Sequence, residues 1–304
     1  MTDQARIITY DCTLRDGEQG AGISFSLEDK LAIVSRLDAF GIDIIEGGFP
    51  ASNPKDIAFF KRVQTLGLTH ARIAAFGSTC RKGTPAEVDS GLADIVASGA
   101  PVATIVGKSW DAQVTRALRT SLEENLRMVR DSVAFLKKAG MDVVFDAEHF
   151  FDGYRANPDY ALAVLDAAAQ AGADSIDLCE TNGGMLPFQV QAIVEVVAAH
   201  LPGQRIGIHT HDDTGCAVAN ALAAVQAGAV QVQGTVNGYG ERVGNADLLT
   251  LIADLQLKMG RTCVSDLTEL TNVANFVAET ANLKLPAHTP YTGSAAFAHK
   301  GGLH

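Results

Sequence analysis

The chain has 304 residues, of which 47% are hydrophobic and 19% charged, a composition typical of a globular protein with one large domain. Its formal net charge of −11 and its lack of Lys/Arg clusters argue against a nucleic-acid partner, because phosphate binding needs a basic surface. The N-terminus lacks the apolar core of a signal peptide, and no apolar run approaches the ~18 residues of a membrane span. We therefore expect a soluble, cytoplasmic protein that contacts no membrane.

Short apolar segments rich in β-branched residues recur along the chain, and five of them follow a glycine that would stop a helix. In chain order these candidate strands are RIITYDCT, AFGIDIIEGG, HARIAAFG, ASGAPVATIVG, KKAGMDVVFDAE, AQAGADSIDLCE, QRIGIHTH and VQAGAVQVQGTV. Eight strand–helix units in ~250 residues match the size of a closed (β/α)₈ TIM barrel. An open doubly wound sheet is the alternative, but the G-x-G-x-x-G phosphate signature after the first strand is missing.

Capping residues mark the starts of several predicted helices. Asn53-Pro54 and Asn157-Pro158 pair an N-cap residue with a proline at the first helical position, and Ser121 opens the capping box SLEE. Thr84-Pro85 with Glu87 predicts a further helix start of the same kind.

The pattern changes after residue 260, which predicts a catalytic barrel over residues 1–260 and a short C-terminal extension over residues 261–304. The extension combines one helical stretch with a Gly-rich tail, residues 286–304, and we interpret it as the truncated start of a helical linker to a missing subdomain. Such a tail is either a frayed end or a lid that needs a partner surface.

Polar side chains gather where the predicted strands end, which is where a barrel places its catalytic groups. These residues are Arg15, Asp16, Glu18, Gln19, Glu46, Lys108, Asp146, Glu148, His149, Glu180, Thr181, Asn182, His209, His211, Asn237, Glu241, Arg242 and Asn245.

Two histidines in this set predict a metal site. His209 and His211 are two residues apart, so on a strand both imidazoles point to the same face. A His-Thr-His triplet alone is more typical of solvated surface, but Asp16 ends the first strand, which only the eighth strand separates from the seventh. Two imidazoles and one carboxylate leave coordination positions open, which favours a catalytic ion over a structural one. Mn²⁺, Mg²⁺ and Zn²⁺ all remain open.

Arg15 stands beside the predicted ligand Asp16. A guanidinium next to a divalent ion suits an oxygen on which negative charge develops. Alternatively, Arg15 pairs with Asp146 or Glu148 to neutralise a buried carboxylate, and the two roles are compatible.

Three motifs carry a resemblance to a known family. TLRDGEQG, GIHTHDDTGCAVANALAA and GYGERVGNADL resemble the signatures of the 2-isopropylmalate synthase and homocitrate synthase family. The wider group includes 3-hydroxy-3-methylglutaryl-CoA lyase and the carboxyltransferase barrel of pyruvate carboxylase. EGGFPASNPKD, FDAEHFFDGYRANPDYAL and CETNGGMLP look most like the citramalate synthase branch. The resemblance covers essentially the whole chain.

The resemblance implies an acyltransferase that condenses acetyl-CoA, as co-substrate, with a 2-oxo acid, pyruvate in this branch, and releases CoA. It implies that the divalent metal is bound by Asp16, His209 and His211, with Asn245 as a fourth ligand or an outer contact. Arg15 would stabilise the oxyanion, and the 2-oxo acid would be contacted by Asp146, Glu148 and Thr181. His304 or Glu148 would be the base, and the working unit would be a homodimer.

Two alternatives stay open at this stage. A 2-isopropylmalate or homocitrate synthase would take a larger 2-oxo acid at the same kind of site. A lyase of the same barrel type is disfavoured, because the loop GYGERVGN lacks the cysteine that the lyases carry there.

Overall fold

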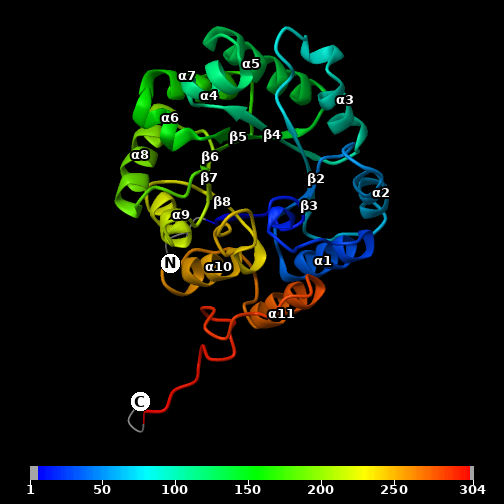
Figure 1. Cartoon of the computed structure of the whole chain (residues 1–304), viewed down its shortest axis with the longest axis vertical. Helices are drawn as coiled ribbons and strands as arrows, with labels where there is room; N and C mark the ends of the chain where they lie inside the picture. The colour runs from blue at the N-terminus through cyan, green and yellow to red at the C-terminus, as the bar shows by residue number, and fades with distance from the viewer. Residues whose placement is uncertain (1–5, 302–304) are drawn as a thin grey trace.

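The computed structural model describes residues 6–301, which form a closed barrel of eight parallel strands in the order of the chain (Figure 1). The strands are β1 (Ile8–Asp11), β2 (Ile44–Gly48), β3 (Arg72–Ser78), β4 (Val102–Lys108), β5 (Asp142–Glu148), β6 (Ser175–Glu180), β7 (Ile206–Thr210) and β8 (Gln231–Gly234). Pairing of β1 with β8 closes the barrel. The predicted TIM barrel is confirmed, and the open-sheet alternative is wrong.

Helices surround the barrel as an outer ring (Figure 1). The main ones are α1 (Leu27–Phe40), α2 (Pro54–Val63), α3 (Ser90–Ala97), α5 (Leu122–Lys138), α6 (Phe150–Ala156), α7 (Pro158–Gln170), α8 (Pro187–His200), α9 (Ala217–Gln226), α10 (Leu248–Leu257) and α11 (Leu270–Thr280). Short turns are η1 (Gly17–Gln19), η2 (Ala86–Val88), α4 (Asp111–Gln113), the π-helical η3 (Val114–Leu118) and η4 (Val236–Gly238). Among the described residues, no helix has the length and apolarity needed to cross a membrane.

Local sequence explains most helix starts. Asn53, Ser121 and Asn157 each accept a backbone N–H in the first turn of α2, α5 and α7, as predicted. The start predicted at Thr84-Pro85 is wrong. Those residues precede the 3₁₀ turn η2, and α3 begins later, where the side chain of Asp89 accepts the N–H of Leu92. Asp89 caps the longer helical segment α3, and this cap prevails over the start signal at Thr84-Pro85.

Most of the apolar core lies between the strands and the helices, where each helix buries one stripe. A small second cluster fills the inside of the barrel with Tyr10, Cys12, Ile44, Ala74, Val102 and Val144. The remaining interior positions are polar and fully buried, among them Thr104, Asp177, Gln231 and Gln233. This polar interior reaches up to the carboxyl ends of the strands.

The segment after α11 leads away from the ring of helices, and its described part lies beside the ring and not over its opening (Figure 1). The Tyr291 hydroxyl donates to Asp254 at 2.6 Å, which attaches the segment to the end of α10. Pro286, His288, Thr289 and Pro290 line a cavity of about 470 Å³, and Asn245 and Asp247 belong to its other wall.

Candidate metal centre at the mouth of the barrel

A cavity of about 360 Å³ opens at the carboxyl ends of the strands. Its walls are formed by Arg15, Asp16, Gln19, Phe49, Phe76, Ser78, Val106, Lys108, Asp146, Glu148, Cys179, Thr181, His209, His211 and Glu241. Most of these residues either end a strand or begin the loop after it. The barrel thus brings together groups that lie up to 226 positions apart in the chain, from Arg15 to Glu241.

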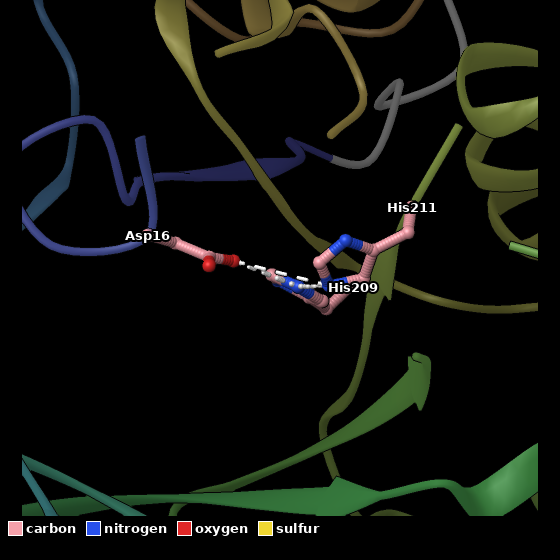
Figure 2. A group of neighbouring side chains, drawn as sticks. All are labelled: Asp16, His209 and His211. Carbon is pink, nitrogen blue, oxygen red and sulfur yellow. Dashed lines mark hydrogen bonds and ion pairs between the residues drawn. The ribbon is translucent and has the colours of Figure 1, made fainter. Parts of the chain in front are cut away.

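Asp16, His209 and His211 point into one space at the edge of this cavity (Figure 2). Asp16 precedes η1, His209 belongs to β7, and His211 directly follows that strand. The two Nε2 atoms are 3.2 Å apart, and Asp16 Oδ2 lies 3.3 Å from the Nε2 of His209 and 4.0 Å from that of His211. All three side chains are buried.

This geometry fits a divalent metal site. Nitrogen ligands lie ~2.1 Å from such ions, so two on one ion are roughly 3.0 to 3.4 Å apart, close to the observed separation. The three ligand atoms all fall within 4.8 Å of one another. One carboxylate and two imidazoles leave positions for substrate oxygens.

The surroundings of the two histidines shift their pKa values in opposite directions. Burial lowers the pKa of His209, but the contact with Asp16 outweighs burial and raises it above the ordinary value. Burial and the neighbouring His209 lower the pKa of His211 to about 3, so this ring stays neutral. Burial opposes ionisation of Asp16, yet Arg15 and the histidines hold the pKa of its carboxyl well below the usual range. The cluster therefore provides an ionised oxygen and at least one neutral imidazole.

Asn245 lies behind Asp16, on the loop after β8. Its Nδ2 donates to Asp16 Oδ2 at 3.2 Å and to the Tyr239 carbonyl at 3.0 Å, while its buried Oδ1 has no hydrogen-bond partner within residues 6–301. Gly240 makes this approach feasible, because a Cβ there would lie 2.4 Å from Asn245 Nδ2. The Asn245 amide orients the carboxylate of Asp16.

Arg15 points across the cavity floor. Its Nε donates to Glu46, its NH1 lies 3.7 Å from Asp16 Oδ1, and its guanidinium stacks 3.9 Å from the centre of the Phe76 ring. The expected alternative partners, Asp146 and Glu148, are not its ion-pair partners. The reason is position, since Glu46 lies in the adjacent strand β2 with its buried carboxylate against the Arg15 guanidinium.

The other predicted substrate contacts lie on β5 and directly after β6. Glu148 pairs with Lys108 from the neighbouring strand β4. Asp146 is buried and accepts from Gln233 at 2.8 Å, and burial together with the nearby Asp177 raises its pKa. Thr181 Oγ1 accepts the N–H of His149 at 2.9 Å and faces the same cavity.

Three residues of the site were either given no role or missed in the sequence analysis. Glu46 and Lys108 were noted as strand-end residues without a role, and Gln233 was not noted at all. The repeated glutamines of the segment QVQ in β8 were the available signal, because amides inside a barrel strand are unusual. His304, predicted to assist proton transfer, lies outside the described residues.

Comparison with known proteins agrees with this geometry. The sequence profile of the HMGL-like family matches residues 6–277. The chain belongs to the HMGL-like family. Among solved structures, an HMG-CoA lyase from Bacillus subtilis superposes with a TM-score of 0.79 at 21% identity, covering 95% of this chain and 98% of the lyase. The carboxyl transferase domain of Rhizobium etli pyruvate carboxylase gives 0.71 at 17% identity, over 94% of this chain and 50% of the other. Both likenesses concern the fold.

Several relatives are much more similar in sequence. An (R)-citramalate synthase from Aquifex aeolicus is 51% identical over 98% of this chain and 57% of its own length, and one from Streptomyces coelicolor is 54% identical over 97% and 56%. A probable 2-isopropylmalate synthase from Methanosarcina mazei is 36% identical over 98% and 55%. The chain thus spans a little over half the length of these curated relatives.

Proposed function

We propose that this chain forms the catalytic barrel of a citramalate synthase, which condenses acetyl-CoA with pyruvate and releases CoA. Five relatives that are 49% to 54% identical bear the name (R)-citramalate synthase. The observation that carries the proposal is the buried cluster of Asp16, His209 and His211 beside Arg15, at the edge of a cavity of about 360 Å³.

Asp16, His209 and His211 would hold the divalent ion, and Asn245 would orient Asp16. A bound ion there would act as a Lewis acid on the keto group of the 2-oxo acid. The contact from Asn245 Nδ2 to Asp16 Oδ2 supports an outer role for this residue. Turning the amide to ligate would sacrifice its donation to the Tyr239 carbonyl.

Arg15 would stabilise charge formed in the reaction. Its position between Asp16 and Glu46 keeps the guanidinium fixed over the Phe76 ring. In the condensation the acetyl methyl loses a proton, its carbon bonds to the keto carbon, and the keto oxygen becomes an alkoxide. Water then cleaves the thioester and CoA leaves. A guanidinium aimed at the developing oxyanion lowers the energy of the transition state of the condensation. Because Arg15 is already held in place, no rearrangement of its side chain is needed.

Glu148 and His304 remain the candidates for the base that removes the methyl proton. Glu148 lines the cavity and is one-quarter exposed, so it is accessible to substrate. Asp146 and Thr181 line the same wall and would contact the 2-oxo acid. A base must reach the proton it abstracts, which favours side chains on this wall.

A CoA-release assay tests the activity, with pyruvate, 2-oxoisovalerate and 2-oxoglutarate as acceptors. We expect pyruvate to give the highest kcat/KM, by roughly tenfold or more, because a pocket shaped for one methyl discriminates against added carbons by that scale. A preference for 2-oxoisovalerate or 2-oxoglutarate would instead indicate a 2-isopropylmalate or homocitrate synthase. Cleavage of 3-hydroxy-3-methylglutaryl-CoA without any condensation would indicate a lyase.

We also propose that the working unit is a homodimer, in which the tail of one subunit covers the barrel mouth of the other. The described part of the tail does not cover the mouth of its own barrel (Figure 1). If the tail is a lid, the barrel mouth of a second copy is therefore the surface that it would cover. Light scattering on the purified protein tests this, and a monomer at micromolar concentration that is fully active would contradict it.

A further inference from the structure

The interior of the barrel contains two glutamines where apolar side chains are usual. Gln231 and Gln233 lie on β8, two residues apart, and therefore project to the same side of the strand. Both are fully buried. Barrel interiors are dominated by Val, Ile and Leu, so two amides at this depth call for a specific role.

The partners of Gln233 favour one orientation of its amide. Its Nε2 donates to Asp146 Oδ1 and to Asp177 Oδ2, both at 2.8 Å. Turning the amide over would place its carbonyl oxygen against two carboxyl groups and leave a donor facing the Cys12 thiol, which itself points at Gln233 Oε1 from 3.6 Å. Amide orientation is decided by such partners.

Asp177 acts as an acceptor throughout this arrangement. Ser175 Oγ donates to its Oδ1 at 2.5 Å, and Gln231 Nε2 lies within 3.0 Å of both of its oxygens. Gly207 on the neighbouring strand β7 leaves room for this carboxyl, since a Cβ there would lie 2.2 Å from it. Asp177 does not line the active-site cavity, so its contacts serve the glutamines.

Because the Nε2 of Gln233 donates to the two aspartates, its Oε1 is left facing His209 Nδ1 at 3.0 Å. A carbonyl oxygen only accepts, so a His209 ring that keeps this contact carries a proton on Nδ1. The opposite nitrogen, Nε2, then carries the lone pair and faces Asp16 and His211. Partners of this kind set the tautomer and the ring angle of metal-binding histidines.

We propose that Gln233 is a positioning residue that fixes the tautomer and ring orientation of His209, with Asp146 and Asp177 holding its amide from behind. The tautomer stands on the geometry of the described residues, whereas its use for metal binding rests on the proposed function. Gln231 contacts Asp177 but not His209, and so provides a matched control on the same strand.

The tautomer is tested first, on metal-free protein, by long-range ¹H–¹⁵N NMR of the imidazoles at about pH 9. The chain has eight histidines, and His209→Gln identifies the His209 signals by their loss. We expect the Nδ1–H form in the wild type and in Gln231→Met, and loss of that single form in Gln233→Met.

Metal affinity is tested next by calorimetric titration of the same proteins with Mn²⁺ alone. Gln233→Met should bind roughly 10- to 100-fold more weakly than the wild type, the scale of losing an outer partner of a metal-binding histidine. Gln231→Met should stay within a few-fold of the wild type. If Gln233→Met does not fold, Gln233→Asn, which is one methylene too short to reach His209, takes its place.

The outcomes separate the two hypotheses. An Nε2–H form in the wild type, an unchanged tautomer in Gln233→Met, or equal losses of affinity in the two Met variants would overturn the role of Gln233. A fixed Nδ1–H form in a protein that binds neither Mn²⁺ nor Zn²⁺ would support that role and overturn the proposed metal site.

Discussion

The two ends of the barrel use the same residue types for different purposes. At the end where the strands begin, each aspartate is surrounded by donors from the chain itself. Asp38 accepts the backbone N–H groups of Thr69, His70 and Ala71, and Asp174 accepts that of Val143 together with Lys137. These carboxylates hold one strand start against its neighbour.

At the end where the strands finish, some charged groups pair, but several polar groups around Asp16 point toward one another without satisfying each other. The Nε2 atoms of His209 and His211 face each other, and the buried Nδ1 of His211 and Oδ1 of Asn245 have no hydrogen-bond partner in the part of the chain that the structure describes. Burying such atoms unpaired costs free energy. Polar groups whose hydrogen-bond partners come from the chain itself indicate a role in stability. Polar groups that converge without such partners indicate a site for a ligand.

Removing a ligand from the mouth should have the largest effect. We expect His209→Ala to lose bound metal and to abolish CoA release while the barrel remains folded, as measured by metal analysis, the CoA assay and circular dichroism. His70→Ala is the matched control, because His70 pairs with Asp43 at the opposite end. Turnover by His209→Ala at the wild-type rate would contradict the metal assignment.

Shortening the tail should be nearly as damaging to turnover but not to metal binding. We expect a chain ending at Leu285 to lose condensation and still bind Mn²⁺, because the tail contributes a covering surface and no ligand. Calorimetry and the CoA assay measure the two effects separately. If turnover is unchanged, the tail is a frayed end and the lid proposal fails.

A conservative change of Arg15 should have a smaller effect. Arg15→Lys keeps the charge but loses the planar fork that contacts Glu46 and stacks on Phe76. We expect kcat to fall roughly 10²-fold, the scale of losing one oxyanion donor, with Mn²⁺ affinity nearly unchanged. Arg72→Lys, which alters an ion pair at the other end, should leave both unchanged. An effect confined to the KM for pyruvate would make Arg15 a substrate anchor.

Changing an aspartate at the opposite end should affect stability and not catalysis. Asp38→Ala leaves three N–H groups without their acceptor, which should lower the free energy of unfolding by about 1–3 kcal/mol and leave kcat unchanged. Burial raises the pKa of Asp38, but these backbone donors outweigh it and lower the pKa below the ordinary value.

The lowered pKa of Asp38 sets the pH dependence of the stability difference between the wild type and Asp38→Ala. A carboxyl with a depressed folded-state pKa stabilises the protein above its unfolded pKa of about 3.9, and this contribution is lost as the pH falls further. The gap in melting temperature between the wild type and Asp38→Ala should therefore be complete at neutral pH and shrink below about pH 4. A gap that widens in acid would contradict the assigned role.

Local patterns in the sequence determined the barrel and most of its site. Eight apolar segments separated by capped helices imply parallel strands in chain order, and such a barrel places strand ends at one mouth. The grouping of Asp16 with His209 and His211 follows from that rule alone. The start of α3 was misplaced, because two capping residues compete within a few positions and only packing selects Asp89.

Only the tertiary structure decided which charged groups pair across the mouth. Arg15 could have reached several carboxylates, and the position of Glu46 in the neighbouring strand β2 selected one of them. The contact between Gln233 and His209 depends on the register of β7 against β8, which pairs Gly207 with Gln231 and Ile208 with Val232 and so brings positions 209 and 233 side by side. Sequence periodicity determines on which face of a strand a side chain lies, but it does not determine the register in which two neighbouring strands pair.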